Sequence, residues 1–205
     1  MIIKCFECSL YMSNCYVVYN EGSKDCFIVD PGAPSMQLEA YLSKNELTPR
    51  YAVLTHGHGD HTDGFPRLKE LYPDIKLIAC RKEATLLYDR RYSMGRGGYV
   101  ADIQVSDGDT SDICGITLKF IETPGHTPGG MCIYIASEGI LFSGDTLFQY
   151  SIGRTDFPGG NYDEIEASIM NKLYTLPDDT RVLPGHMGET SIGKEKVYNP
   201  FVSVL

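Results

Sequence analysis

Five short apolar runs in this chain each end abruptly at a polar cluster that contains glycine or proline. The pattern recurs from the first third of the sequence to the last, and runs of this length and composition are typical of buried strands. We therefore predict strands over Cys26–Asp30, Tyr51–Thr55, Ile116–Ile121, Ile140–Phe142 and Arg181–Leu183. A further run, Met131–Ala136, leads through residues 137–139 into the fourth strand and predicts a β-hairpin.

Segments with amphipathic helical spacing lie between these strands. The predicted helices span Ser35–Leu47, Phe65–Tyr72, Lys82–Tyr88 and Asp163–Leu176. Strands alternating with helices indicate a layered α/β protein, and the hairpin indicates that its sheets are mixed. The glycine-dense stretch Met94–Tyr99 is predicted to be a loop or lid. No linker-like segment interrupts the 205 residues, so we expect one domain over residues 1–205.

The chain has only five histidines, and each stands in a polar cluster just beyond an apolar run. Because ligands bind beyond the carboxyl ends of strands in open α/β sheets, these clusters should converge on one crevice. Residues two apart on an extended backbone share a face, so His56 and His58 can face one ion. Asp60 and His61 then serve a second ion. The glycines between them let the segment turn sharply and keep bulk away from the ions.

Three further residues complete a predicted two-metal centre. His126 would join the first ion and His186 the second, while Asp145 would bridge both through its two oxygens. A lone histidine is more often a hydrogen-bonded structural residue, but seven matched ligands favour a metal site. Imidazole and carboxylate suit zinc, iron or manganese. We predict two divalent ions, zinc first and iron or manganese as alternatives, held by His56, His58, Asp60, His61, His126, Asp145 and His186.

Other charged residues near these clusters have two interpretations. Asp30, before a Pro-Gly pair, is either a turn-capping carboxylate or a partner that orients a metal ligand, and we favour the second. Arg154 and Asp156 are interpreted as a salt bridge that pins a loop. Arginines beside a glycine-rich turn, such as Arg96, are usually solvated. No residue is therefore assigned to substrate binding.

Charge and cysteine content narrow the partners and the compartment. A net charge of −9 offers no basic surface for nucleic acid. The N-terminus lacks the apolar segment of a signal peptide, and no run reaches the ~18 apolar residues of a membrane span, so a cytoplasmic protein without a membrane partner is expected. Cys5 and Cys8 form a C-x-x-C with no second pair, and we interpret the seven cysteines as reduced, mostly buried thiols.

The ordered ligand set resembles the metallo-β-lactamase superfamily over nearly the whole chain. The resemblance rests on His56-x-His58-x-Asp60-His61, followed by His126, Asp145 and His186. It implies an α/β fold of a specific kind, the αββα four-layer sandwich with two mixed β-sheets flanked by helices. The dinuclear site would lie at one edge of that sandwich.

Within the superfamily the chain is similar to the glyoxalase II, or hydroxyacylglutathione hydrolase, group. The similarity lies in residues 123–128, 143–148 and 153–160, and in Asp145 where many lactamases have cysteine. Antibiotic hydrolysis is not expected. Because the chain ends soon after His186, we expect no C-terminal helical domain of the kind that grips glutathione in larger members. Residues 153–157 also resemble persulfide dioxygenases.

The resemblance implies a metal-dependent hydrolase of a small-molecule thioester, with S-lactoylglutathione as the leading candidate. A metal-bridging hydroxide would attack the carbonyl, and Asp60 would act as the catalytic residue that aims it. The alternative is a mononuclear iron persulfide dioxygenase using His56, His58, and His126 or Asp145. A third possibility is a non-enzymatic metal-binding module. The sequence leaves the oligomeric state open.

Overall fold

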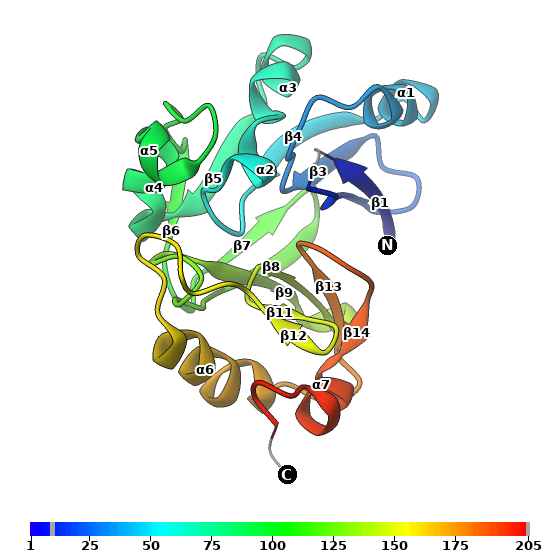
Figure 1. Ribbon diagram of the computed structural model, residues 1–205. Helices are drawn as coiled ribbons and strands as arrows, with labels where there is room; N and C mark the ends of the chain where they lie inside the picture. The colour runs from blue at the N-terminus through cyan, green and yellow to red at the C-terminus, as the bar shows by residue number, and fades with distance from the viewer. Residues whose placement is uncertain (9–10, 204–205) are drawn as a thin grey trace.

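The computed structural model describes residues 1–8 and 11–203 and contains two six-stranded sheets that pack face to face (Figure 1). In the first sheet the strands follow chain order. They are β1 (Ile2–Cys8), β2 (Ser13–Tyr19), β3 (Asp25–Val29), β4 (Thr48–Val53), β5 (Lys76–Cys80) and β6 (Ile103–Val105). The first three strands pair antiparallel and the last four pair parallel, so this sheet is mixed.

The second sheet is mixed as well, because β10 pairs parallel with β13 while its other pairs are antiparallel. Its strand order is β14 (Thr190–Ser191), β13 (Arg181–Pro184), β10 (Ile140–Gly144), β9 (Met131–Ile135), β8 (Ile116–Glu122) and β7 (Thr110–Ile113). The predicted hairpin is confirmed, with Ile140 opposite Ile135. A small ribbon of β11 (Leu147–Phe148) and β12 (Ser151–Ile152) follows β10.

Helices cover the outer face of each sheet, which gives the expected αββα layers (Figure 1). Beside the first sheet lie α1 (Met36–Lys44), α2 (Gly59–Thr62), α3 (Phe65–Leu71), η1 (Arg81–Glu83), α4 (Ala84–Tyr88) and α5 (Arg90–Ser93). Beside the second lie α6 (Tyr162–Asn171), η3 (Leu173–Thr175) and α7 (Ile192–Tyr198), and η2 (Ala136–Glu138) joins β9 to β10. No helix in the described part of the chain is long and apolar enough to cross a membrane.

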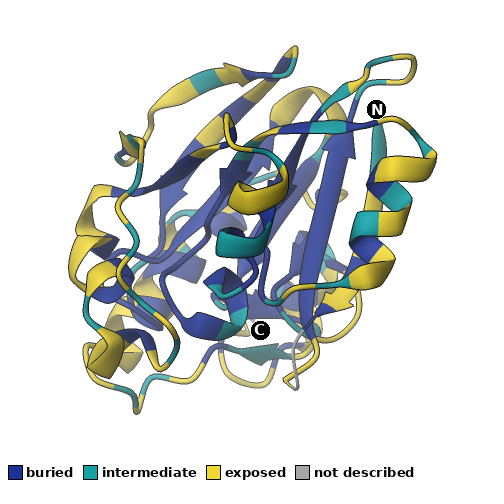
Figure 2. Cartoon of the chain, turned by 90° about the horizontal axis from the view of Figure 1, so that it is seen from above, coloured by how far each residue is buried: buried dark blue, intermediate teal, exposed yellow. Residues whose placement is uncertain are grey.

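Three clusters of buried apolar side chains hold the two sheets and the two sets of helices together. In β3, Phe27 and Val29 pack between the sheets, whereas Cys26 and Ile28 pack under the first set of helices. Both faces of the strand are therefore buried, which explains why it is a continuous apolar run. A third cluster joins the second sheet to α6 through Ile165 and Ile169. Figure 2 shows the central strands buried and the outer faces of the helices exposed.

The predicted helices exist, but all four are shorter than expected, and two of them end well before the predicted residue. Ser35 caps α1, because its Oγ accepts a hydrogen bond from the Leu38 N–H, and the helix ends at Lys44 rather than Leu47. The helix predicted to reach Leu176 stops at Asn171, and a separate 3₁₀ turn follows. Residues 94–101 form the predicted loop.

Candidate metal centre

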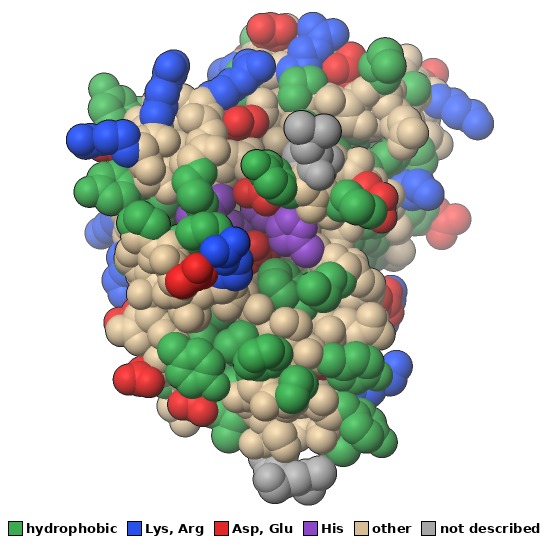
Figure 3. All heavy atoms as spheres, viewed as in Figure 1, with side chains coloured by type: hydrophobic (Ala, Val, Ile, Leu, Met, Phe, Trp, Pro, Cys, Tyr) green, Lys and Arg blue, Asp and Glu red, His purple; other side chains and the backbone are tan. Residues whose placement is uncertain are grey.

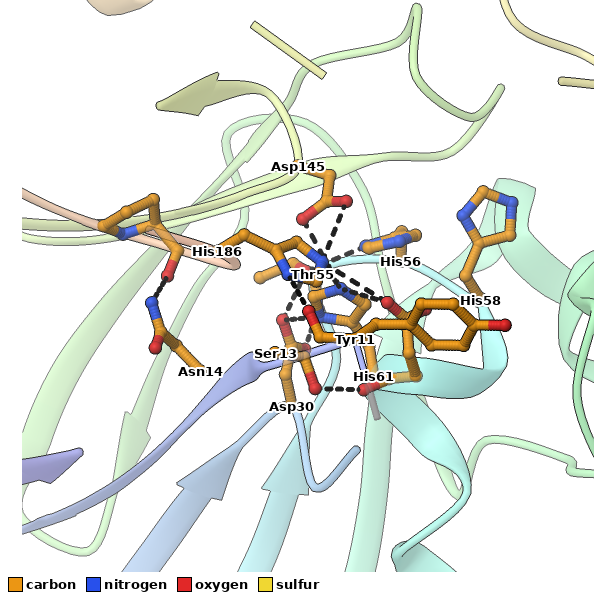
Figure 4. Close-up of polar contacts among 12 residues, drawn as sticks. Tyr11, Ser13, Asn14, Asp30, Thr55, His56, His58, His61, Asp145 and His186 are labelled. Atoms are coloured by element: carbon orange, nitrogen blue, oxygen red, sulfur yellow. Dashed lines mark hydrogen bonds and ion pairs between the residues drawn. The ribbon is translucent and has the colours of Figure 1, made fainter. Parts of the chain in front are cut away.

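All seven predicted ligands lie just beyond the carboxyl ends of strands, as the sequence pattern predicted. The segment from His56 to His61 follows β4 of the first sheet, whereas His126, Asp145 and His186 follow β8, β10 and β13 of the second. The structure brings these side chains together where the strand ends of the two sheets meet (Figure 4). The site thus depends on the packing of both sheets.

His56, His58 and His126 form one cluster, called here the first group. One nitrogen from each ring lies within 4.8 Å of the others, and His58 Nδ1 is 2.9 Å from His126 Nε2. All three side chains are buried. His56 Nε2 has no hydrogen-bond partner among the described residues. A buried, unpartnered imidazole nitrogen beside two others is what a metal cation would satisfy.

Asp60, His61 and His186 form a second cluster, called here the second group. His186 Nε2 lies 3.2 Å from His61 Nε2 and 3.3 Å from Asp60 Oδ2. This group is more open, because about a fifth of the Asp60 and His186 side chains is exposed whereas His61 is fully buried. The three atoms fit one cation with two imidazoles and a carboxylate as ligands.

Asp145 stands between the two groups. Its Oδ1 lies 3.4 Å from His61 Nε2, and its Oδ2 lies 3.6 Å from His126 Nε2 and 3.5 Å from His186 Nε2. Oδ1 is buried and accepts no hydrogen bond within residues 1–8 and 11–203. This is the placement expected of a carboxylate shared between two ions, and the residues present therefore fit a dinuclear centre.

Backbone and side-chain partners set which ring nitrogens face the centre. The His126 Nδ1–H donates to the Arg154 carbonyl at 2.7 Å, which leaves Nε2 free to face Asp145. His186 Nδ1 similarly lies 3.1 Å from the Tyr11 carbonyl oxygen. Such partners fix the tautomer of a metal-binding histidine and raise the basicity of its free nitrogen.

Asp30 orients a ligand, as the favoured interpretation predicted. It is 1% exposed, and its Oδ2 lies 3.1 Å from His61 Nδ1. The carboxylate also accepts hydrogen bonds from the Thr55 N–H at 2.7 Å and the Thr55 hydroxyl at 2.6 Å. Thr55 Oγ1 in turn lies 3.1 Å from His56 Nδ1. Asp30 therefore supports His61 directly and His56 through Thr55, a link that sequence reasoning missed.

Glu83 is a second supporting residue that sequence reasoning missed. It is 1% exposed, and its Oε2 accepts a hydrogen bond from the Gly57 N–H at 2.9 Å. Its Oε1 accepts from the Thr127 hydroxyl at 2.6 Å and the Gly129 N–H at 2.7 Å. One carboxylate thus joins the loop of His56 and His58 to the loop of His126.

The two groups differ in charge. In the first group, burial and the neighbouring histidines lower the pKa of His56, and burial and His126 lower the pKa of His58 to about 4. In the second group, burial opposes protonation of His61, but Asp145 and Asp30 outweigh it and raise the pKa to about 10. Burial likewise opposes protonation of His186, yet its pKa is raised by Asp60 and Asp145. Without metal, a proton therefore occupies the second group.

A pocket of about 890 Å³ reaches both groups, with His58 and His126 as well as Asp60 and His186 in its lining. Figure 3 shows the histidines in a hollow that is bordered mostly by hydrophobic side chains, with a few charged ones among them. The Arg154 guanidinium lines this pocket and pairs with Asp156 at 2.7 and 2.9 Å, so the predicted salt bridge is present. Arg96 is exposed and is not part of the lining, and its backbone N–H donates to Asp63.

The cysteines lie outside this centre. All seven are free thiols, and five of them are buried, as predicted. Cys5 is exposed on β1 whereas Cys8 is buried, and burial and the neighbouring Cys8 raise the pKa of the Cys5 thiol to about 11. The clusters of potential metal ligands found among the described residues contain no cysteine.

Several proteins of similar sequence span essentially the same length. An uncharacterized protein of Aquifex aeolicus is 37% identical over all of this chain and 99% of its own. The probable metallo-hydrolase YqgX of Bacillus subtilis is 35% identical over 93% of this chain and 92% of its own. The hydroxyacylglutathione hydrolase GloC of Haemophilus influenzae is 29% identical over 99% of both chains.

Solved structures share the fold. The BLEG-1 B3 metallo-beta-lactamase superposes with a TM-score of 0.92 at 35% identity, over 98% of this chain and 99% of its own. TTHA1623, solved in a di-iron-bound form, gives 0.85 at 29% identity over 97% and 99%. ETHE1 from Myxococcus xanthus gives 0.83 at 28% identity over 99% and 85%. Residues 9–186 match the Metallo-beta-lactamase superfamily, and this chain therefore belongs to that superfamily.

Proposed function

We propose that the protein is a two-metal hydrolase that cleaves small-molecule thioesters, as hydroxyacylglutathione hydrolases do. The observation that carries this proposal is the placement of Asp145 between the two ligand groups, within 3.6 Å of a nitrogen from each. A site for a single ion would have no use for the second group. The di-iron form of TTHA1623, at 29% identity, supports two ions in this fold.

The residues divide the work of such a reaction among themselves. Two bound cations would lower the pKa of a water molecule and polarise the carbonyl that it attacks. Asp60 lines the pocket and would accept a hydrogen bond from the attacking water, which would aim it at the carbonyl. Asp145 Oδ2 lies near the Nε2 atoms of both His126 and His186 and would help to keep the two rings in position.

The leaving group is the feature that favours thioesters. All five histidines of the chain lie in the two groups, so none remains to protonate a departing atom. A thiolate is a weak base and leaves without a proton, whereas an alkoxide or an amide anion needs one. GloC, at 29% identity over nearly its whole length, is named as a hydroxyacylglutathione hydrolase, which supports the same substrate class.

Turnover of S-lactoylglutathione by protein of known metal content tests the proposal. We expect hydrolysis that scales with occupancy up to two metals per chain, and loss of activity by more than about 100-fold in Asp60→Asn. Asp179→Asn, an exposed carboxylate before β13, is the matched control and should retain activity. Absence of turnover with two metals bound, for this and simpler thioesters, would overturn the proposal.

An iron-dependent persulfide dioxygenase is the second candidate. It is favoured by the first group, whose three imidazoles lie beside Asp145 and could hold one iron without the second group. Oxygen uptake with glutathione persulfide, together with one iron per chain, would support it. Because BLEG-1 is titled a B3 metallo-beta-lactamase, a chromogenic cephalosporin belongs in the same assays. We expect it to be a poor substrate.

A further inference from the structure

We propose that the pocket selects thioesters with an uncharged, apolar acyl group, and that three methionines form an adaptable rim for that group. The rim consists of Met12, Met94 and Met187, which all line the pocket. The inference rests on the proposed function, since it names the substrate class of the same site. Three observations support it: the apolar residues in the lining, the backbone conformation of the three methionines and the charged side chains of the pocket.

The three methionines come from three separate loops. Met12 precedes β2, Met94 follows α5, and Met187 directly follows the ligand His186. Their side chains remain 51–59% exposed, although methionine is an apolar residue that usually packs inside. Beneath them Phe148, Ile152 and Phe157 line the same pocket. Apolar side chains therefore line the hollow both at its mouth and near the candidate ligands.

Each rim methionine has a backbone conformation that is uncommon for a residue with a side chain. The φ angles of Met12, Met94 and Met187 are 56°, 51° and 66°. Left-handed backbone in a non-glycine residue costs of order 1 kcal/mol or more and persists where surrounding structure imposes it. Three such residues at one pocket mouth indicate that the loops are held in place for binding.

Contacts next to each methionine show what holds these loops. Next to Met12, the Ser13 hydroxyl donates to the Asp60 carbonyl at 2.6 Å. The Asn14 side-chain amide donates to the Met187 carbonyl at 2.9 Å. After Met94, Gly95 lies so close to Gly59 that a Cβ on Gly59 would be 2.5 Å from the Gly95 Cα.

Fixed backbones combined with exposed, unbranched side chains make an adaptable surface. The thioether chain has three rotatable bonds and is polarizable, so it can adjust to ligands of different shape. Because the backbone is already placed, only side-chain rotations are needed when a ligand binds. The rim can therefore cover acyl chains of several lengths.

Away from the metal ligands, the pocket offers an anionic acyl group no free cationic partner. There the described lining contains the carboxylate of Glu7 and one cationic side chain, that of Arg154. That guanidinium is paired with Asp156 and lies 4.1 Å from the centre of the Phe157 ring. A carboxylate at the end of an acyl chain that extends toward the rim, away from the cations, would lose water without gaining a free partner.

Thioesters of N-acetylcysteamine test this selectivity, because their thiol half is neutral and constant. For the metal-loaded protein we expect kcat/KM to rise by up to about fourfold per methylene from acetyl to hexanoyl. Succinyl thioester should react more than about tenfold slower than butyryl thioester. A flat series, or a preference for succinyl, would overturn the inference while leaving thioester hydrolysis intact.

Variants of the rim connect the selectivity to the methionines. Replacing all three by glutamine, as Met12→Gln, Met94→Gln and Met187→Gln together, keeps side-chain length but adds a polar amide. We expect the hexanoyl-to-acetyl ratio of kcat/KM to fall at least fivefold. Met36→Gln, at an 87% exposed position on α1, is the matched control and should keep the ratio. An unchanged ratio in the triple variant would assign the selectivity elsewhere.

A binding measurement separates failure of this inference from failure of the proposed function. Alkyl hydroxamic acids anchor to a metal site without turnover, so their chain explores the pocket whatever reaction occurs there. Calorimetry with metal-loaded protein should show Kd falling from acetohydroxamate to hexanohydroxamate and rising again for the succinyl analogue. Chain-dependent binding without thioester turnover would overturn only the function. A Kd that does not change with the length of the alkyl chain would overturn the proposed role of the methionine rim.

Discussion

The two groups of candidate ligands lie side by side, but the pKa values of their histidines are shifted in opposite directions. The first consists of three buried imidazoles, and its neighbours and its burial lower the pKa values of His56 and His58. The second combines Asp60 with His61 and His186, whose pKa values are raised. Positive charge is therefore disfavoured on His56 and His58, whereas the carboxylates around the second group favour a proton or a cation there.

This difference assigns the groups different tasks. The three imidazoles of the first group are buried, so a cation held there would be largely shielded from solvent. Both groups reach the pocket, but the Asp60 and His186 side chains are about a fifth exposed, so solvent has more access to the second group. We infer that a cation in the second group exchanges more readily than one in the first. The following changes break or sharpen this contrast.

The largest effect on metal affinity is expected from substitution of Asp145, because this residue contacts both groups. Asp145→Ala removes the carboxylate that contacts His61, His126 and His186, so both sites should weaken. We expect more than about 100-fold loss of affinity at each, beyond what loss of an outer partner costs. Competition titration with a chromophoric chelator resolves the two binding steps. The control Asp179→Ala should bind as wild type, and loss at only one site in Asp145→Ala would contradict a bridging role.

Asp30→Asn should weaken metal binding at the two sites to different extents, because Asp30 contacts His61 directly and His56 only through Thr55. An amide cannot accept every hydrogen bond that the carboxylate accepts and carries no charge to hold the His61 proton. We expect a roughly 10- to 100-fold loss of affinity at the second site and a smaller loss at the first. Thr55→Val should show the reverse order. Equal losses at both sites in both variants would refute the assignment.

Glu83→Gln tests the support of the first group. The amide of glutamine would place a donor against either the Gly57 N–H or the Thr127 and Gly129 donors. We expect about 1–3 kcal/mol lower free energy of unfolding and about tenfold weaker binding at the first site, with the second site little changed. Glu138→Gln, an exposed position in η2, controls for the substitution itself. Weakening confined to the second site would exclude this role.

The sequence pattern identified the candidate ligands more readily than the residues that support them. Each candidate ligand lies in a short polar segment after a strand, and the structure brings all seven side chains together. Glu83 carries no such signal, because a charged residue in an amphipathic segment is usually solvated. Its partners Gly57, Thr127 and Gly129 are 26 to 46 residues away.

The periodicity of apolar residues could not predict the four-layer sandwich either. Strands buried on both faces are continuous apolar runs, and such runs do not tell which strand lies beside which. The parallel pair of β10 and β13, for example, joins segments about 40 residues apart in the chain. Local patterns therefore indicated layered α/β, and only the resemblance to a family supplied the four-layer arrangement.

The most gradual effect is expected from pH on the metal-free protein, because it is spread over several pH units, and it measures the difference between the groups directly. His58 has a folded pKa of about 4, below its ordinary 6.5, so the unfolded chain binds more protons in that range and stability falls as the pH drops from about 6.5 toward 4. His61 has a folded pKa of about 10, so its contribution is complete below about 6.5 and is lost as the pH rises toward 10.

Chelator-treated protein should therefore be most stable near pH 6.5, with a slope of at most about 1.4 kcal/mol per pH unit for each proton on either side. Urea unfolding at several pH values measures this curve. Saturating zinc should remove the alkaline fall, because the cation takes the place of the proton among Asp30, Asp60 and Asp145, and should steepen the acid fall, because protons compete for the ligands. A metal-free curve that stays flat from about pH 6.5 to 9 would show that no proton occupies the second group.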